Sequence, residues 1–119
     1  MSHLINLTPH AINLIAPGAG EIIIPPSGDV ARVYADKTIE NIEAVIENCH
    51  YTIPVGKVEY GKIIGLPKND TEAIYIVSAM VLSRAEQENL PHNLVAPDTG
   101  NAIRNPDGTI RGVPGFIKY

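Results

Sequence analysis

The sequence predicts a small α+β domain that is rich in β-strands, with short antiparallel strands and one or two helices. Apolar and polar residues alternate over short segments, as they do in half-buried strands. Ten glycines and ten prolines fall at intervals between these segments and mark turns. One segment instead carries good helix-forming residues in succession, at residues 79–89. We therefore expect the 119 residues to form a single domain, 1–119, around one hydrophobic core.

The N-terminal quarter is expected to form short strands joined by tight turns. Residues 4–15 alternate in polarity and break at Thr8-Pro9, which indicates two short strands. Glycine and proline at residues 17–20 predict a turn, and the β-branched residues 21–24 predict the next strand. Residues 11–25 thus have the pattern of a hairpin.

The middle of the chain admits two interpretations. Residues 30–34 alternate again, and residues 51–64 indicate one long or bulged strand. Between them, in residues 37–48, isoleucine and valine recur at the i, i+3, i+6, i+7 spacing of a helix face. This spacing favours a second helix, with a polar-edged strand as the alternative.

The C-terminal half contains the clearest local signals. Residues 73–77 are wholly apolar and predict a strand inside the sheet. Ser78 is placed to cap the helix expected at 79–89, and Asn105-Pro106-Asp107-Gly108 suits a type I turn. Helices and strands alternate too little along the chain to predict a parallel βαβ sheet.

Charge and composition exclude several classes of protein. The net charge is −4 and no run of Lys or Arg exists, which argues against a protein that coats nucleic-acid polymers. The single cysteine, Cys49, excludes an internal disulfide and a cysteine-based zinc site. The N-terminus lacks the pattern of a signal peptide, and the apolar stretch 73–82 is about half of what a membrane span needs. We expect a cytoplasmic protein that does not engage a membrane.

The motifs of common catalytic and cofactor sites are missing from the sequence. The four histidines lack the spacing of a local metal site, and no serine has the GxSxG context of a hydrolase. Neither phosphate-binding glycine signature occurs. Cys49 and His50 are adjacent, so on a strand they would point to opposite faces and could not form a catalytic pair. We therefore assign no catalytic residue, no metal and no cofactor.

The arginines are the best candidates for binding, because their planar fork of donors suits phosphate and carboxylate oxygens. There are only four, and they lie at segment boundaries or among apolar positions. A serine at a helix N-terminus favours anions as well, and a histidine follows the bend at Thr8-Pro9. The candidate ligand-binding residues are His10, Arg32, Ser78, Arg84, Arg104 and Asp107. The alternative is structural: each arginine pairs with one of the 13 acids, and His10 is a turn residue.

Several short motifs follow one another in a characteristic order. They are Asn6-Leu7-Thr8-Pro9-His10, Pro26-Ser27-Gly28 followed by Val30-Ala31-Arg32-Val33, Gly65-Leu66-Pro67, Tyr75-Ile76-Val77-Ser78, and Asp107-Gly108 with Gly112 and Gly115-Phe116. In this order they resemble a family of small proteins encoded by tailed phages, prophages and some actinobacteria. The resemblance spans nearly the whole chain and is loosest over residues 36–52. Many members of that family have a segment similar to Arg-x-Asp-Leu after the helix, whereas this chain has Glu88-Asn89-Leu90-Pro91 at the corresponding place.

The resemblance implies a phage setting rather than an activity. Size, acidity and the lack of catalytic motifs are similar to those of phage proteins that sequester nucleotide signals of bacterial immunity, which is an analogy of class. The leading hypothesis is a non-enzymatic protein that binds a small phosphate-bearing molecule, such as a cyclic nucleotide. A homo-oligomer is expected, because a pocket between subunits encloses more of a ligand than so small a monomer can.

Two other functions remain open. One is a small hydrolase in which His10 acts as general base and Asp98 or Asp107 orients it. The other is a protein-interaction module that inhibits a host enzyme, through an exposed apolar patch around Val113, Phe116 and Ile117.

Overall fold

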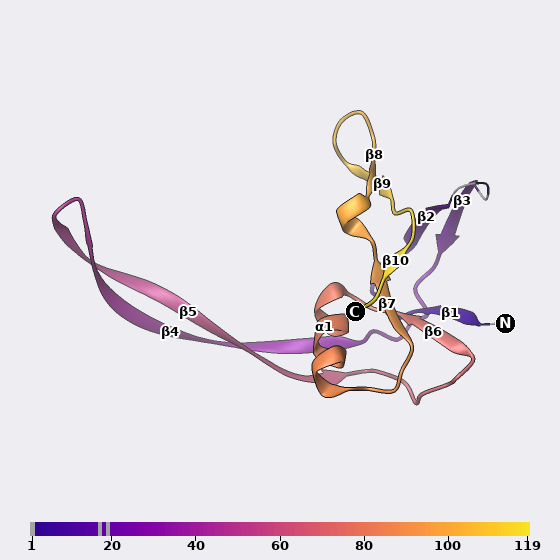
Figure 1. The fold of residues 1–119 in the computed structure, drawn as a ribbon, viewed down its shortest axis with the longest axis horizontal. Coiled ribbons are helices and arrows are strands. Elements are labelled where there is room, and N and C mark those ends of the chain that lie inside the picture. The colour runs from indigo at the N-terminus through magenta and orange to yellow at the C-terminus, as the bar shows by residue number, and fades with distance from the viewer. Residues whose placement is uncertain (1, 17, 19) are drawn as a thin grey trace.

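The computed structural model describes residues 2–16, 18 and 20–119. The chain forms a small body from which one long hairpin extends as an arm (Figure 1). The radius of gyration is 18.9 Å and the principal extents are 62 × 40 × 24 Å. A compact domain of this length would have a radius of gyration of about 14 Å. The arm accounts for the difference.

The body is organised around a four-stranded sheet in the order β1-β6-β7-β10. Its strands are β1 (His3–Asn6), β6 (Ala73–Ile76), β7 (Leu94–Pro97) and β10 (Phe116–Ile117). The first three pair in parallel, and β10 pairs antiparallel to β7. Helix α1 (Ala79–Glu88) connects β6 to β7, as a parallel connection requires. The expectation that no parallel βαβ unit would form is therefore wrong, because one helix between two neighbouring strands suffices to build it.

Helix α1 covers one face of this sheet. Every second side chain of β6 and β7 points to this face, because side chains alternate along a strand. These side chains pack against α1 and form the main core. The residues of this core include Leu7, Tyr75, Val77, Val81, Leu82, Ala85, Leu94 and Ala96. All of them are buried.

A second hairpin covers the opposite face of the sheet. It consists of β2 (Ile12–Ala16) and β3 (Gly20–Ile24), and it confirms the hairpin expected at residues 11–25. Ile12 packs there with Ile76 and Val113 in a smaller core cluster. The turn expected at residues 17–20 includes residues 17 and 19, which lie outside the described residues.

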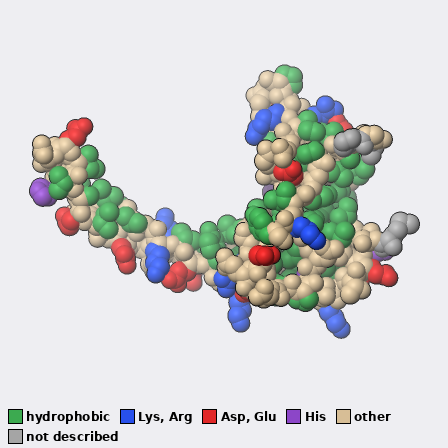
Figure 2. All heavy atoms as spheres, viewed as in Figure 1, with side chains coloured by type: hydrophobic (Ala, Val, Ile, Leu, Met, Phe, Trp, Pro, Cys, Tyr) green, Lys and Arg blue, Asp and Glu red, His purple; other side chains and the backbone are tan. Residues whose placement is uncertain are grey.

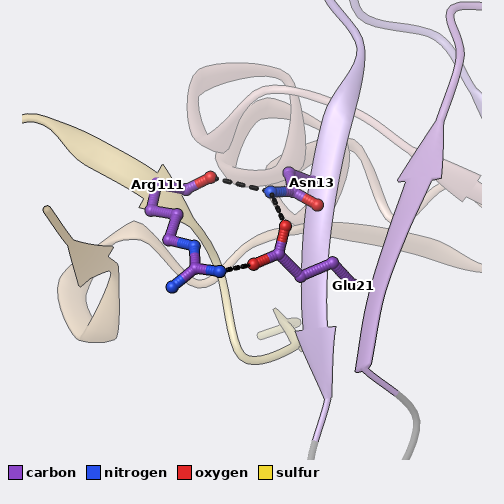
Figure 3. A network of polar contacts seen from close by, with 3 residues as sticks. All are labelled: Asn13, Glu21 and Arg111. Atoms are coloured by element: carbon purple, nitrogen blue, oxygen red, sulfur yellow. Dashed lines mark hydrogen bonds and ion pairs between the residues drawn. The ribbon is translucent and has the colours of Figure 1, made fainter.

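A third hairpin, β8 (Ile103–Arg104) and β9 (Ile110–Gly112), follows the short 3-10 helix η1 (Thr99–Asn101). The turn expected at residues 105–108 is confirmed, and the Gly108 amide donates to the Asn105 carbonyl at 2.9 Å. A polar network holds β9 against β2 and β3 (Figure 3). Asn13 donates to the Arg111 carbonyl at 3.0 Å, and the Arg111 guanidinium forms an ion pair with Glu21.

The arm consists of β4 (Arg32–Ile46) and β5 (Cys49–Ile64), paired antiparallel from Arg32–Ile64 to Ile46–Cys49. A register shift lies between Val33 and Ala35, near its base. At its tip, Glu47 and Asn48 have φ of 50° and 65°, which is the positive pair that a two-residue type I′ turn requires.

The arm corrects one prediction and confirms another. The helix expected at residues 37–48 does not form, because most of this segment belongs to β4 and pairs with β5. The apolar spacing of this segment is compatible with both a helix and a strand. Isoleucine, valine and threonine lose less side-chain rotamer freedom in strands than in helices, which favours the strand. The long or bulged strand expected at 51–64 is present within β5. The α+β prediction, β-rich with short antiparallel strand pairs and a single helix, is confirmed.

Candidate functional site

A groove of about 360 Å³ lies where the body meets the base of the arm. We call it the arm-base groove. It is formed by the bend after β1, the first residues of β4 and the N-terminal end of α1. Its lining includes Thr8, Pro9, Arg32, Tyr34, Ser78 and Met80. Two of the six candidate ligand-binding residues, Arg32 and Ser78, thus lie in one groove.

Ser78 caps α1 as its position in the sequence predicts. Its backbone is extended, with φ −67° and ψ 159°, and its hydroxyl oxygen accepts a hydrogen bond from the Val81 amide at 3.3 Å. The first turn of α1 contains no acidic residue. The positive end of the helix dipole is therefore not neutralised by a side chain of the helix, and it lies at the groove.

Arg32 is the first residue of β4 and is exposed. The backbone beside it is anchored to the bend after β1, because the Ala31 amide donates to the Leu7 carbonyl at 3.0 Å. Arg32 makes no ion pair and no side-chain hydrogen bond with any residue that the structure describes. Its five guanidinium donors are therefore open to a ligand in the groove.

The bend that forms one wall is built around a buried asparagine. Asn6 is 2% exposed, and its amide nitrogen donates to the carbonyls of His10 and Ile24. Its amide oxygen accepts from the Thr8 amide and hydroxyl. His10 itself is exposed, does not line the groove, and takes part in this network through its backbone carbonyl. The structure therefore places His10 as a turn residue.

Arg84 lies beyond Met80, in a neighbouring hollow of about 320 Å³ that Tyr60 and Tyr119 also line. It forms an ion pair with Glu88 at 3.3 Å, one helical turn away, and donates to Gln87 at 3.2 Å. Its Nε is buried without a partner among the described residues. Arg84 thus matches the structural alternative in part, because its terminal nitrogens are already engaged.

The remaining two candidates lie in the β8–β9 hairpin, away from the arm-base groove. Arg104 donates to the Gly108 carbonyl at 2.8 Å and holds the turn closed. Asp107 accepts from the Thr109 hydroxyl at 2.6 Å and from its amide at 3.0 Å. These hydrogen bonds hold the pKa of Asp107 below its ordinary value, and the bond from the Thr109 hydroxyl has the larger effect. Both side chains stabilise the turn that carries them.

Tyr34 and Met80 were not among the candidates, yet both line the arm-base groove. Tyr34 is 61% exposed and offers an aromatic face beside Arg32. The sequence signal for it is weak, because a tyrosine in an alternating segment is usually half-buried packing. Met80 carried no signal other than its place in the first turn of α1.

The two alternative functions fare differently. No hydrogen bond joins the described ring of His10 to Asp98 or Asp107, and no group of three or more potential metal ligands occurs among the described residues. The apolar patch expected at the C-terminus is wrong: Val113 is 5% exposed, and Phe116 and Ile117 pack against the two core clusters. Exposed apolar side chains gather instead along the arm (Figure 2).

No protein-family model matches this sequence, and no match was found among curated proteins or solved structures. In the part of the chain that the structure describes, no helix has the length and apolar character needed to cross a membrane. Function is therefore inferred from the geometry of the groove and the arm.

Proposed function

We propose that this chain is a non-enzymatic binding protein that holds a small phosphate-bearing ligand in the arm-base groove. The observation that carries the proposal is that the N-terminal end of α1 lines the same groove as Arg32, whose guanidinium has no partner among the described residues. An arginine fork and a helix N-terminus are two independent features that favour the same anionic group.

The rest of the groove suits a nucleotide-like molecule. A phosphate placed between Arg32 and the first turn of α1 would leave the organic part of the ligand beside Tyr34 and Met80. An aromatic face can stack on a base, and methionine adapts to an irregular apolar shape. The volume of about 360 Å³ lies at the lower end of the range for small-molecule sites.

The proposed role is sequestration of a phosphate-bearing immune signal, such as a cyclic nucleotide, in the cytoplasm of a phage-infected host. Sequestration needs tight binding and no bond cleavage, so the groove requires only preformed donors. A homo-oligomer suits this role, because a neighbouring copy can cover a groove that one chain leaves open.

Titration calorimetry with a panel of mononucleotides and cyclic dinucleotides tests the proposal. We expect Arg32→Ala to weaken binding at least tenfold, since a hydrogen bond to a charged group contributes about 1.5–3 kcal/mol. Arg104→Ala is the matched control: it removes an exposed arginine that lies outside the groove and should leave affinity unchanged. Equal affinity in both variants, or no binding of any phosphate-bearing compound by the wild type, would refute the assignment.

A protein-interaction module that inhibits a host enzyme is the second candidate function. The exposed apolar side chains of the arm favour it, among them Ile39, which is 66% exposed, and Val58, which is 46% exposed. The test is capture of a host enzyme by the wild type and measurement of its activity with purified protein added. The candidate fails if the activity does not fall, or if Ile39→Asp and Val58→Asp inhibit as well as the wild type.

A further inference from the structure

The two faces of the arm differ in character near its tip. In an antiparallel ribbon, residues paired across the strands point to the same side, and the side alternates along each strand. The register pairs Ile42 with Ile53, Ala44 with Tyr51 and Ile46 with Cys49. These six residues and Val55, which follows in the same alternation, form what we call the tip face. Its seven side chains are apolar or uncharged, and Glu40, the partner of Val55 in the register, lies beside them at the edge of the face nearer the body.

Most charged side chains of the arm lie away from the tip face. Glu43 and His50 alternate to the opposite face of the tip. Glu40 lies at the edge of the tip face, and the pair Asp36–Glu59 lies on the same side but nearer the body. In the view of Figure 2, apolar side chains line one edge of the arm and most of its charged side chains line the other. On a chain with net charge −4, the seven side chains of the tip face carry no charge, and another copy can stack on them while Glu40 stays at the rim of the contact.

The tip face is open to solvent in the isolated chain. Ile42 is 45% exposed, Ile46 52%, Tyr51 48% and Val55 43%. Only the base of the arm touches the core, through Val33 and Ile63. A two-stranded ribbon is marginally stable in water on its own, so a long arm with one apolar face needs a covering layer whenever the chain is folded.

We propose that the tip face binds the tip face of a second copy of this chain, so that two arms stack as a four-stranded, two-layer contact related by a two-fold axis. A second copy is the one partner that is present wherever the chain is made. An uncharged apolar face is also its own complement, which is what an isologous interface requires. Tyrosine and isoleucine side chains then form an apolar interface core, and the charged faces remain in water.

The area involved is that of a reversible dimer. The tip face exposes roughly 500 Å², which is in the upper range for a single patch on a monomer. Two such faces would bury about 1,000 Å², at the lower limit for a specific protein–protein interface. We therefore expect a dimer that forms at micromolar concentration and dissociates on dilution.

Sedimentation velocity over a range of concentrations tests the proposal, with neighbouring residues of β4 as the matched pair. Ile46→Lys places a charge on the tip face, whereas Val45→Lys places the same charge on the opposite face, at a residue of similar exposure. We expect Ile46→Lys to weaken the dimer at least tenfold and Val45→Lys to leave it unchanged. Ile46→Thr, which keeps the strand preference of a β-branched residue, should weaken it in the same direction if the arm itself stays folded.

A mixing experiment separates arm-to-arm stacking from docking of an arm on the body of another copy. Tagged wild-type chain should capture untagged wild type but not untagged Ile46→Lys, because stacking requires both tip faces. Capture of Ile46→Lys would overturn the proposal, since a wild-type arm could still dock on the variant's body. A wild type that stays monomeric throughout, or a dimer equally weakened by Val45→Lys, would overturn it too.

A chemical probe is available in the wild-type chain itself. Cys49, the single cysteine of the sequence, is exposed and belongs to the tip face. Its rate of maleimide labelling should fall as concentration rises through the dimer range, and a constant rate would contradict stacking. Phosphate ligands are absent from all of these experiments, so the dimer is tested independently of the ligand proposed for the arm-base groove.

Discussion

Replacing Asn6 by aspartate is the sharpest test of how the bend after β1 is held together. The two side chains have nearly the same shape, so the change removes the amide donors and adds no volume. In the structure those donors reach the carbonyl of His10 at 2.8 Å and that of Ile24 at 3.2 Å. They connect the end of β1 to the bend and to the end of β3. A carboxylate in their place would face two carbonyl oxygens.

The expected loss follows from the burial of these groups. Asn6 is 2% exposed, so water has little access to the position of the lost donors. A buried polar group left without its partner costs about 1–3 kcal/mol, and the His10 carbonyl keeps a hydrogen bond from the Thr8 hydroxyl at 3.0 Å, so we expect a total loss of about 2.5 kcal/mol. Because whole domains are stable by only about 5–15 kcal/mol, this is a large fraction of the total. At roughly 4 °C per kcal/mol, the melting temperature should fall by about 10 °C.

Urea denaturation followed by circular dichroism measures the change, with wild type and variants at one protein concentration because association shifts apparent stability. Asn41→Asp, the same substitution at an exposed position of the arm, is the control and should stay within about 0.5 kcal/mol of the wild type. Thr8→Val keeps the donors of Asn6 and should cost less than Asn6→Asp. If Asn6→Asp lost less than 1 kcal/mol, on the order of one weak hydrogen bond, the bend would not depend on this amide.

Three further predictions concern a glycine, a helix cap and a turn. Gly65 has φ +88°, and a Cβ there would clash with the Val30 carbonyl oxygen, whereas Gly28 has φ +102° with open space around it. Gly65→Ala should therefore lower the free energy of unfolding more than Gly28→Ala does. Equal losses in the two variants would contradict the clash. Ser78→Asp keeps an N-cap acceptor and should preserve the melting temperature, because an acid is favoured at a helix N-terminus. The same substitution should weaken phosphate binding at least tenfold. Unchanged affinity would place the ligand outside the arm-base groove. The pKa of Asp107 is lowered by Thr109 in the folded chain, so its contribution to stability is present above the unfolded pKa and is lost as pH falls through the folded pKa. A carboxyl titration by NMR should place the Asp107 pKa below its ordinary value and closer to it in Thr109→Val; an ordinary pKa in the wild type would be inconsistent with the hydrogen bonds described.

Local signals in the sequence predicted the elements that depend on local chemistry. The Ser78 cap, helix α1 and the apolar strand β6 follow from capping, helix propensity and an uninterrupted apolar run. The segment 37–48 was ambiguous, because its apolar residues satisfy both a helix and a strand. Its outcome depends on pairing with β5, which lies farther along the chain.

Non-local pairings were beyond the reach of the sequence pattern. Nothing in residues 3–6 indicates that they pair in parallel with residues 73–76. The polarity pattern of a strand is the same whichever strand it pairs with. The candidate site shows the same limit. Arg32 and Ser78 line one groove because the fold brings the start of β4 and the N-terminal end of α1 to the bend after β1, whereas Arg104 lies in the β8–β9 hairpin.

The pairing of β1 with β6 also sets the order in which the parts of a newly made chain can fold. β1 is synthesised first, but its partner begins at Ala73, so at about 5–20 residues per second it waits for roughly 4–14 seconds. The whole arm emerges within that interval, and a hairpin closes in about 1–10 μs once its residues are available. All residues of the tip face are therefore synthesised before β6, the partner of β1, becomes available. Under the stacking proposed above, two chains translated side by side on one messenger would meet through their arms before either of them has a core.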